Sequence, residues 1–157
     1  MNEDIQDPKL QGLYQRLSTI RNTRVGDIMT RNVITLESTD LLATAARTMI
    51  ENHINGIVVM KEGRPWSILT SYDLLHKSYV ESFSDKMDYL RSTLEHLIET
   101  PTLHYLRSSD SLDSAARMFT AYALRTIPVL EEAQLVGVIS LTDLVKSYSK
   151  LVSEPSI

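Results

Sequence analysis

The chain has 157 residues, a length that suits one domain, and its 43% hydrophobic and 23% charged residues are an ordinary globular balance. It has no cysteine, which excludes disulfides, thiolate metal sites and cysteine nucleophiles. The net charge of −4 disfavours non-specific binding to nucleic acids, whose phosphates demand a cationic surface. No apolar run approaches the roughly 18 residues of a membrane helix, and the acidic N-terminus shows no secretory signal, so we expect a cytoplasmic protein.

Residues 8–23 are predicted to form an amphipathic helix. Its apolar residues recur at helical spacing, at Leu10, Leu13, Tyr14, Leu17 and Ile20. A stripe of this kind is usually a packing face. The helix therefore needs a surface to cover it, either on the rest of the chain or on a second copy. We treat residues 1–24 as an element outside the rest of the fold.

The next part of the chain contains two copies of one unit, at residues 25–83 and 102–151. Asp73 recurs as Asp143, an offset of 70 (143 − 73), and no gap is needed between Asp40 and Val145. The same offset relates Asp40, Leu42, Ala45, Ala46, Arg47, Ile57, Val59 and Glu62 to Asp110, Leu112, Ala115, Ala116, Arg117, Ile127, Val129 and Glu132. Two copies, in place of a long array, indicate a closed pair.

Each unit is predicted to run strand, helix, strand, strand, helix, which makes the fold α+β. In the first unit the strands are 33–36, 57–60 and 65–69; one helix ends near Asn55–Gly56, and another spans 71–83. In the second unit the strands are 103–106, 127–130 and 135–139, and the last helix is 141–151. Polar clusters at 38–40 and 108–110 are predicted helix caps. A helix at 84–101 connects the units, and the tail 152–157 is expected to fray.

A hydroxyl and an acid follow the last strand of each unit, as Thr70 and Asp73 and as Ser140 and Asp143. A strand-to-helix junction presents unpaired N–H groups and the positive end of a helix dipole, a natural seat for phosphate. One carboxylate can accept hydrogen bonds from both hydroxyls of a ribose, at about 1.5–3 kcal/mol each. The same pattern is also a capping box, which is the plainer interpretation of either junction alone.

Several motifs in order resemble the tandem CBS-domain pair, or Bateman module. They are Gly26-Asp27-Ile28-Met29-Thr30, the Leu-x-x-Ala-Ala helix openings, Arg125-Thr126-Ile127-Pro128-Val129 and Gly137-Val138-Ile139-Ser140-Leu141-Thr142-Asp143-Leu144. The resemblance covers residues 25–151. It implies two β-α-β-β-α repeats packed sheet to sheet about a pseudo-two-fold axis, here with an extra N-terminal helix, and it implies a homodimer. It also implies regulatory binding of an adenine nucleotide (AMP, ADP or ATP) or an S-adenosyl compound in the clefts between repeats.

The resemblance assigns residues to two clefts. In the first cleft it implies ribose at Asp73, phosphate at Thr70, and adenine against Leu103, His104, Arg125 and Thr126. In the second cleft it implies ribose at Asp143, phosphate near Ser140 and Thr142, and adenine against Val33, Ile34, Asn55 and Gly56. This sequence departs from the pattern at Ser67, where the second repeat has Gly137, and at Val58, where it has Pro128.

Two functions from different classes stay open. One is a nucleotide sensor that passes a change of shape to an unknown regulated protein; the other is a ligand-free dimerisation or scaffold module that acts through protein–protein contacts. We do not expect an enzyme, because no nucleophile, base or metal set can be placed. The histidines, His53, His76, His96 and His104, lack metal-ligand spacing. We expect no required cofactor, no nucleic acid partner and no membrane partner.

Overall fold

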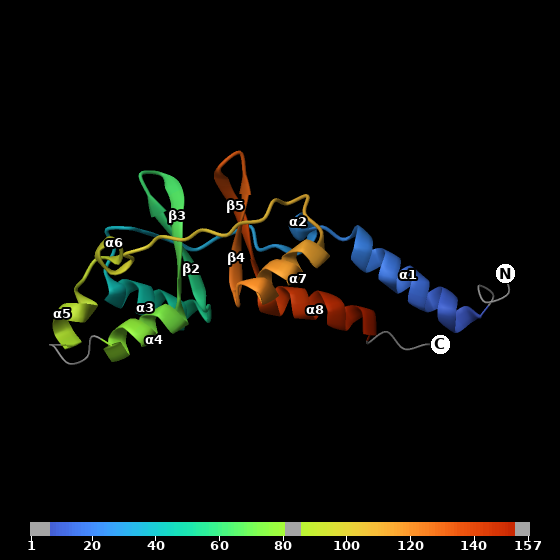
Figure 1. The fold of residues 1–157 in the computed structure, drawn as a ribbon, viewed down its shortest axis with the longest axis horizontal. Coiled ribbons are helices and arrows are strands. Elements are labelled where there is room, and N and C mark those ends of the chain that lie inside the picture. The colour runs from blue at the N-terminus through green and yellow to red at the C-terminus, as the bar shows by residue number, and fades with distance from the viewer. Residues whose placement is uncertain (1–6, 81–85, 153–157) are drawn as a thin grey trace.

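A computed structural model describes residues 7–80 and 86–152, which form two α+β halves joined side by side (Figure 1). This confirms the predicted fold class. The elements are α1 (Pro8–Asn22), α2 (Val25–Ile28), β1 (Thr35–Glu37), α3 (Leu42–Asn52), β2 (Gly56–Lys61), β3 (Arg64–Thr70), α4 (Ser71–Val80), α5 (Lys86–Leu90), α6 (Leu94–Leu97), α7 (Leu112–Ala121), β4 (Thr126–Glu131), β5 (Gln134–Ser140) and α8 (Leu141–Val152).

The two halves share one plan of sheet and helices. In the first, β1 pairs in parallel with β2, which pairs antiparallel with β3; in the second, β4 pairs antiparallel with β5. The register repeats at the offset of 70, since Val58 faces Ile68 and Pro128 faces Val138. Both hairpins shift register just after Val59 or Val129. Strands β3 and β5 contact each other across the two halves, so the sheets meet as predicted.

The strand predicted at 103–106 is wrong, because only Leu106 forms a bridge, to Val129. Extending this parallel pairing upstream would need an amide hydrogen from Pro128, and proline has none. Extending it downstream would need the Ser108 N–H to reach the backbone of Leu130, as Ser38 N–H reaches the Met60 carbonyl at 2.8 Å. Ser108 N–H instead donates to Oε1 of Glu131 at 2.9 Å.

Two predicted helices also differ from the structure. Helix α3 ends at Asn52, and His53 takes the left-handed conformation (φ 52°) in place of Asn55 or Gly56. The early end lets Ile54 turn back onto the first core. The connecting helix is broken into α5 and α6, because Thr93 leaves helical geometry to pair with Leu41. Helix α4 is described as far as Val80, and residues 81–83 of the predicted helix lie outside the described residues, as does the tail from 153.

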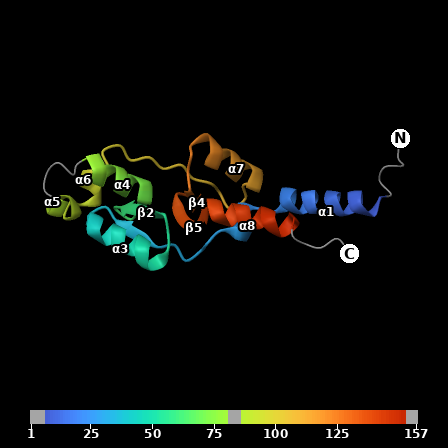
Figure 2. The same ribbon diagram turned by 90° about the horizontal axis from the view of Figure 1, so that it is seen from below.

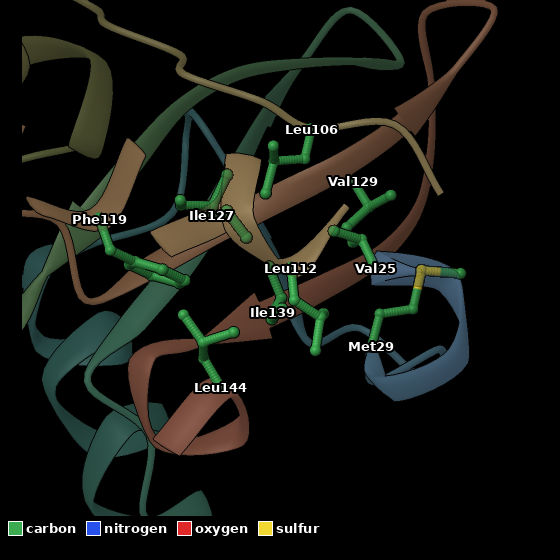
Figure 3. Close-up of a cluster of buried hydrophobic side chains, with 10 residues drawn as sticks. Val25, Met29, Leu106, Leu112, Phe119, Ile127, Val129, Ile139 and Leu144 are labelled. Atoms are coloured by element: carbon green, nitrogen blue, oxygen red, sulfur yellow. The ribbon is translucent and has the colours of Figure 1, made fainter. Parts of the chain in front are cut away.

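Helix α2 belongs to the core of the second half, although it precedes the first half in sequence. Val25 and Met29 are buried with Leu112, Phe119, Ile127 and Ile139 (Figure 3). The Val25 N–H donates to the Asp110 carbonyl and the Gly26 N–H to the Ser108 carbonyl, both at 2.9 Å. The second half therefore completes its core with a helix from the start of the chain.

Helix α6 makes the reciprocal exchange. Leu94 and Leu97 are buried in the core of the first half, beside Leu36, Leu42 and Ile57. The Leu94 N–H donates to the Asp40 carbonyl at 2.9 Å, and the Glu95 N–H donates to the Ser38 carbonyl at 2.8 Å. The bonds of α2 and α6 are thus copies of each other, and each helix packs on the half other than the one formed by the strands that follow it.

Helix α1 is a helix as predicted, with Asp7 as its N-cap and Pro8 in its first turn. It extends away from the two halves in both views (Figures 1 and 2) and contacts α7 and α8 of the second half. Its apolar stripe is left uncovered, since Leu13, Tyr14 and Leu17 are each more than half exposed. No helix in residues 7–80 or 86–152 has the length and apolar character to cross a bilayer.

Gly137 provides a close approach that a larger residue would block. A Cβ atom there would lie 2.5 Å from Sδ of Met29. We expect Gly137→Ala to lower the free energy of unfolding by about 1–3 kcal/mol through overpacking, measured by urea denaturation. Gly12→Ala is the control: no atom lies within 4 Å of its Cβ position in α1, so it should be neutral or slightly stabilising. Equal stability of the Gly137→Ala and wild-type proteins would contradict the packing.

Glu131 titrates under the influence of Ser108. The Ser108 hydroxyl and then the Ser108 N–H donate to its carboxylate and lower the pKa of Glu131. Burial opposes this shift, and the charge of Arg107 adds to it. We expect Ser108→Ala to raise the pKa of Glu131 toward its ordinary value, seen by NMR titration of the carboxyl carbon. Ser109→Ala is the control. A pKa that stays put in Ser108→Ala would show that the hydroxyl has no such effect.

Candidate functional site

The two halves enclose a pocket of about 780 Å³. One wall is the β3–α4 junction of the first half; the other is made by residues 98–104 and by the link from α7 to β4. It is lined by Leu42, Ser67, Ile68, Leu69, Thr70, Ser71, Tyr72, Asp73, Lys77, Tyr89, Leu97, Ile98, Glu99, Thr100, Thr102, His104, Tyr122, Ala123, Leu124, Arg125 and Thr126. Residues from both repeats therefore face one space, as a cleft between repeats requires.

Thr70 and Asp73 form a capping box at the start of α4. The Thr70 N–H and hydroxyl donate to Oδ2 of Asp73 at 2.8 and 2.6 Å, and the Asp73 N–H donates to Oγ1 of Thr70 at 3.1 Å. The plainer interpretation of this motif is thus present in the fold. Both bonds that the carboxylate accepts from Thr70 use Oδ2, so Oδ1 of Asp73 is the carboxylate atom that a ligand hydroxyl could reach within the lined pocket.

The opposite wall brings aromatic and cationic groups to the pocket. The rings of His104 and Tyr122 are stacked, with centroids 4.0 Å apart and planes 25° apart. Arg125 is exposed and Thr126 half-buried in the same wall. One wall therefore offers a carboxylate beside a helix start, and the other offers flat rings and a guanidinium. Together they can hold a ligand that has hydroxyls, a ring and a negative charge.

The structure brings together most residues predicted for the first cleft. Thr70, Asp73, His104, Arg125 and Thr126 all line the pocket, whereas Leu103 does not. Their roles toward a ligand stay predictions.

Sequence reasoning missed several polar residues of this pocket, among them Lys77, Glu99 and Tyr122. Lys77 lies one turn after Asp73 on the same helix face, a spacing that could have identified it. Glu99 pairs with it, with Nζ and Oε1 3.6 Å apart. Tyr122 gave no sequence signal, because its place depends on how the end of α7 meets residues 98–104.

The residues predicted for the second cleft are arranged differently. Ser140 and Asp143 repeat the capping box, with bonds of 2.9 and 3.1 Å. Gly56 packs against Thr126: a Cβ atom placed on Gly56 would lie 2.9 Å from Oγ1 of Thr126. The 780 Å³ pocket contains none of the second set, which is Val33, Ile34, Asn55, Gly56, Ser140, Thr142 and Asp143. Their assignment to a ligand stays a prediction.

We see no candidate metal site in residues 7–80 and 86–152. No group of three or more His, Asp or Glu side chains there could hold an ion.

This geometry defines a class of protein in which two copies of one α+β unit share a pocket. The chain belongs to the CBS-domain family: the CBS domain matches residues 25–79 and 95–150, as the sequence motifs predicted.

Relatives and solved structures agree with this family. Protein MJ1404 of Methanocaldococcus jannaschii is 28% identical over 156 residues, covering 94% of this chain and 37% of that protein. CBSX2 in complex with AMP aligns with a TM-score of 0.70 at 22% identity, covering 83% of this chain and 99% of that one. The CBS domain pair of protein MJ0100, in complex with 5′-methylthioadenosine and S-adenosyl-L-methionine, aligns with a TM-score of 0.67 at 22% identity, covering 82% and 97%. The chain spans less than half the length of the curated relatives MJ1404 and MJ1225.

Proposed function

We propose that the protein is a regulatory module that senses an adenine nucleotide or an S-adenosyl compound in the pocket between its repeats. One observation carries the proposal: Thr70 and Asp73 of one repeat face His104, Arg125 and Thr126 of the other across a single 780 Å³ space. That volume falls within the usual range for small-molecule sites. Two proteins of the same fold are known in complex with AMP and with S-adenosyl-L-methionine, which supports this ligand class.

The proposed ligand pose follows from the chemistry of the walls. Oδ1 of Asp73 accepts from the ribose hydroxyls, while its Oδ2 stays bound to the N-terminal end of α4. The positive end of the dipole of that helix, together with the Arg125 guanidinium, attracts a phosphate or a carboxylate. The base lies toward His104 and Thr126. Binding requires groups from both repeats at once.

A ligand bound in this pocket could signal by changing the arrangement of the two repeats. It bridges α4 to residues 98–104, which lead from the first core into the second repeat. A ligand shifts an equilibrium only by its difference in affinity for two arrangements, and a ligand that touches both repeats senses their relative position. The regulated protein reads that arrangement. This role needs no catalysis by the module itself.

A second candidate, a ligand-free dimerisation module, is favoured by a separate observation. Apolar residues stay exposed on α1 and on α4, where Tyr72, Leu75 and Tyr79 are each about 70% exposed or more. Exposed apolar stripes of this kind mark protein–protein contacts. We propose a homodimer that buries them, and dimerisation is compatible with ligand sensing.

The ribose assignment is tested by removing the carboxylate. We expect Asp73→Ala to weaken AMP binding by about 10- to 100-fold, from the loss of charged hydrogen bonds, measured by calorimetry. Asp40→Ala is the matched control, because Asp40 accepts a similar backbone bond, from Glu37 N–H at 2.8 Å, outside the pocket. Asp143→Ala reports on the second cleft in the same way. Wild-type affinity in both Asp73→Ala and Asp143→Ala would rule out the ribose assignment.

The dimer is tested on α1. Light scattering should find the wild-type chain as a dimer and the double variant Leu13→Glu, Leu17→Glu shifted toward monomer, because two buried leucines become two like charges. Gln15→Glu adds charge to the same helix off the apolar stripe and should leave the dimer intact. A monomeric wild type, or a double variant that dimerises equally well, would contradict a dimer through α1.

A further inference from the structure

The two clefts differ most in their aromatic wall. His104 and Tyr122 come from separate segments, one after α6 and the other at the end of α7, yet their rings stack at 4.0 Å and both line the pocket. Tyr122 is 55% exposed, so a large part of its ring is open to a ligand. The stack therefore presents a flat surface inside a pocket whose other wall carries the ribose-binding candidate Asp73.

The other cleft cannot build this surface. At the offset of 70, the positions equivalent to His104 and Tyr122 are Ile34 and Asn52, neither of which has an aromatic ring. The Asn52 side chain donates instead to the Thr48 carbonyl of its own helix, at 2.9 Å. Arg125 is likewise matched by the uncharged Asn55. Duplication has kept the Asp and hydroxyl in both repeats, but at the positions of His104, Tyr122 and Arg125 the first repeat has neither a ring nor a cation.

A stacked pair of rings favours a third planar ring. Offset stacking of aromatic groups contributes roughly 0.5–1.5 kcal/mol beyond the area that it buries. Bases stack on aromatic side chains regardless of their hydrogen-bonding edges, because every base has a π-face. A two-ring purine covers more of such a surface than a one-ring pyrimidine. The wall is thus a means of selecting the base, while Asp73 recognises the sugar.

We propose that the base stacks on the His104–Tyr122 pair, that Tyr122 is a specificity-determining residue for a purine, and that the first cleft binds nucleotide much more tightly than the second. This inference rests on the proposed function of the same pocket. It adds to that function the base-selecting group and the stoichiometry, which is one tightly bound nucleotide per chain.

The test measures binding of AMP and UMP by calorimetry to wild type, Tyr122→Leu, Tyr122→Phe and Tyr105→Leu. Tyr122→Leu should weaken AMP binding about 2- to 12-fold and narrow the preference for AMP over UMP. Tyr122→Phe keeps the ring and should restore wild-type affinity. Tyr105→Leu is the matched control, because Tyr105 is an exposed tyrosine that does not line this pocket. Thermal unfolding confirms that each variant is folded.

A spectroscopic readout separates stacking from general damage. The ring C–H signals of His104 should move on addition of AMP to wild type and to Tyr122→Phe, through the ring current of the base, with one equivalent of AMP completing the change. Equal AMP affinity and equal base preference in Tyr122→Leu and wild type would overturn the inference while leaving the proposed function intact. Two equivalent tight sites would overturn it as well. Failure of wild type to bind AMP, UMP, S-adenosyl-L-methionine or adenosine would overturn the proposed function itself.

Discussion

The rest of the structure depends on the exchange of two short helices between the repeats. Val25 in α2 is fully buried in the core of the second half, and Leu94 in α6 is fully buried in the core of the first half. Their N–H groups donate to the carbonyls of Asp110 and Asp40, equivalent residues at the offset of 70. Neither core is complete without a segment from outside its own unit. The packing of these helices therefore constrains the relative position of the two halves, and with it the distance between the pocket walls.

The two clefts differ although the backbone of the two repeats is similar. The difference between Gly137 and the equivalent Ser67 is one reason. Gly137 lets Met29 and Thr30 lie directly on β5, where Thr30 and Val138 exchange backbone bonds of 2.8 and 2.9 Å. The equivalent Ser67 is buried with a side chain of its own, and its hydroxyl lies 3.5 Å from the Thr102 carbonyl. The segment that contains Thr102 stays in the pocket wall. The departure from the family pattern at Ser67 coincides with the side of the molecule that has the large pocket.

Much of the fold could be predicted from the sequence, because its signals are local. Helical spacing located α1, and the offset of 70 located both hairpins and the two Asp-containing junctions. The errors arose where distant residues decide. The strand near Leu106 is cut short by a proline and by Glu131 on another strand, and the break between α5 and α6 follows from pairing with Leu41. In the pocket, Thr70, Asp73 and Arg125 stood in recognisable motifs. Tyr122 and Glu99 did not, because only tertiary packing puts them beside His104 and Lys77.

The exchanged helices also govern how the chain folds as it is made. When the first repeat leaves the ribosome its core still lacks Leu94 and Leu97, so it stays open until α6 has emerged. Val25 cannot find its final neighbours until Ile139, more than a hundred residues later, has been synthesised. Contacts between residues so far apart in sequence slow folding and leave apolar surface exposed meanwhile. The second half therefore cannot complete its core without α2, whereas the core of the first half comes from one continuous stretch of chain, residues 36–97.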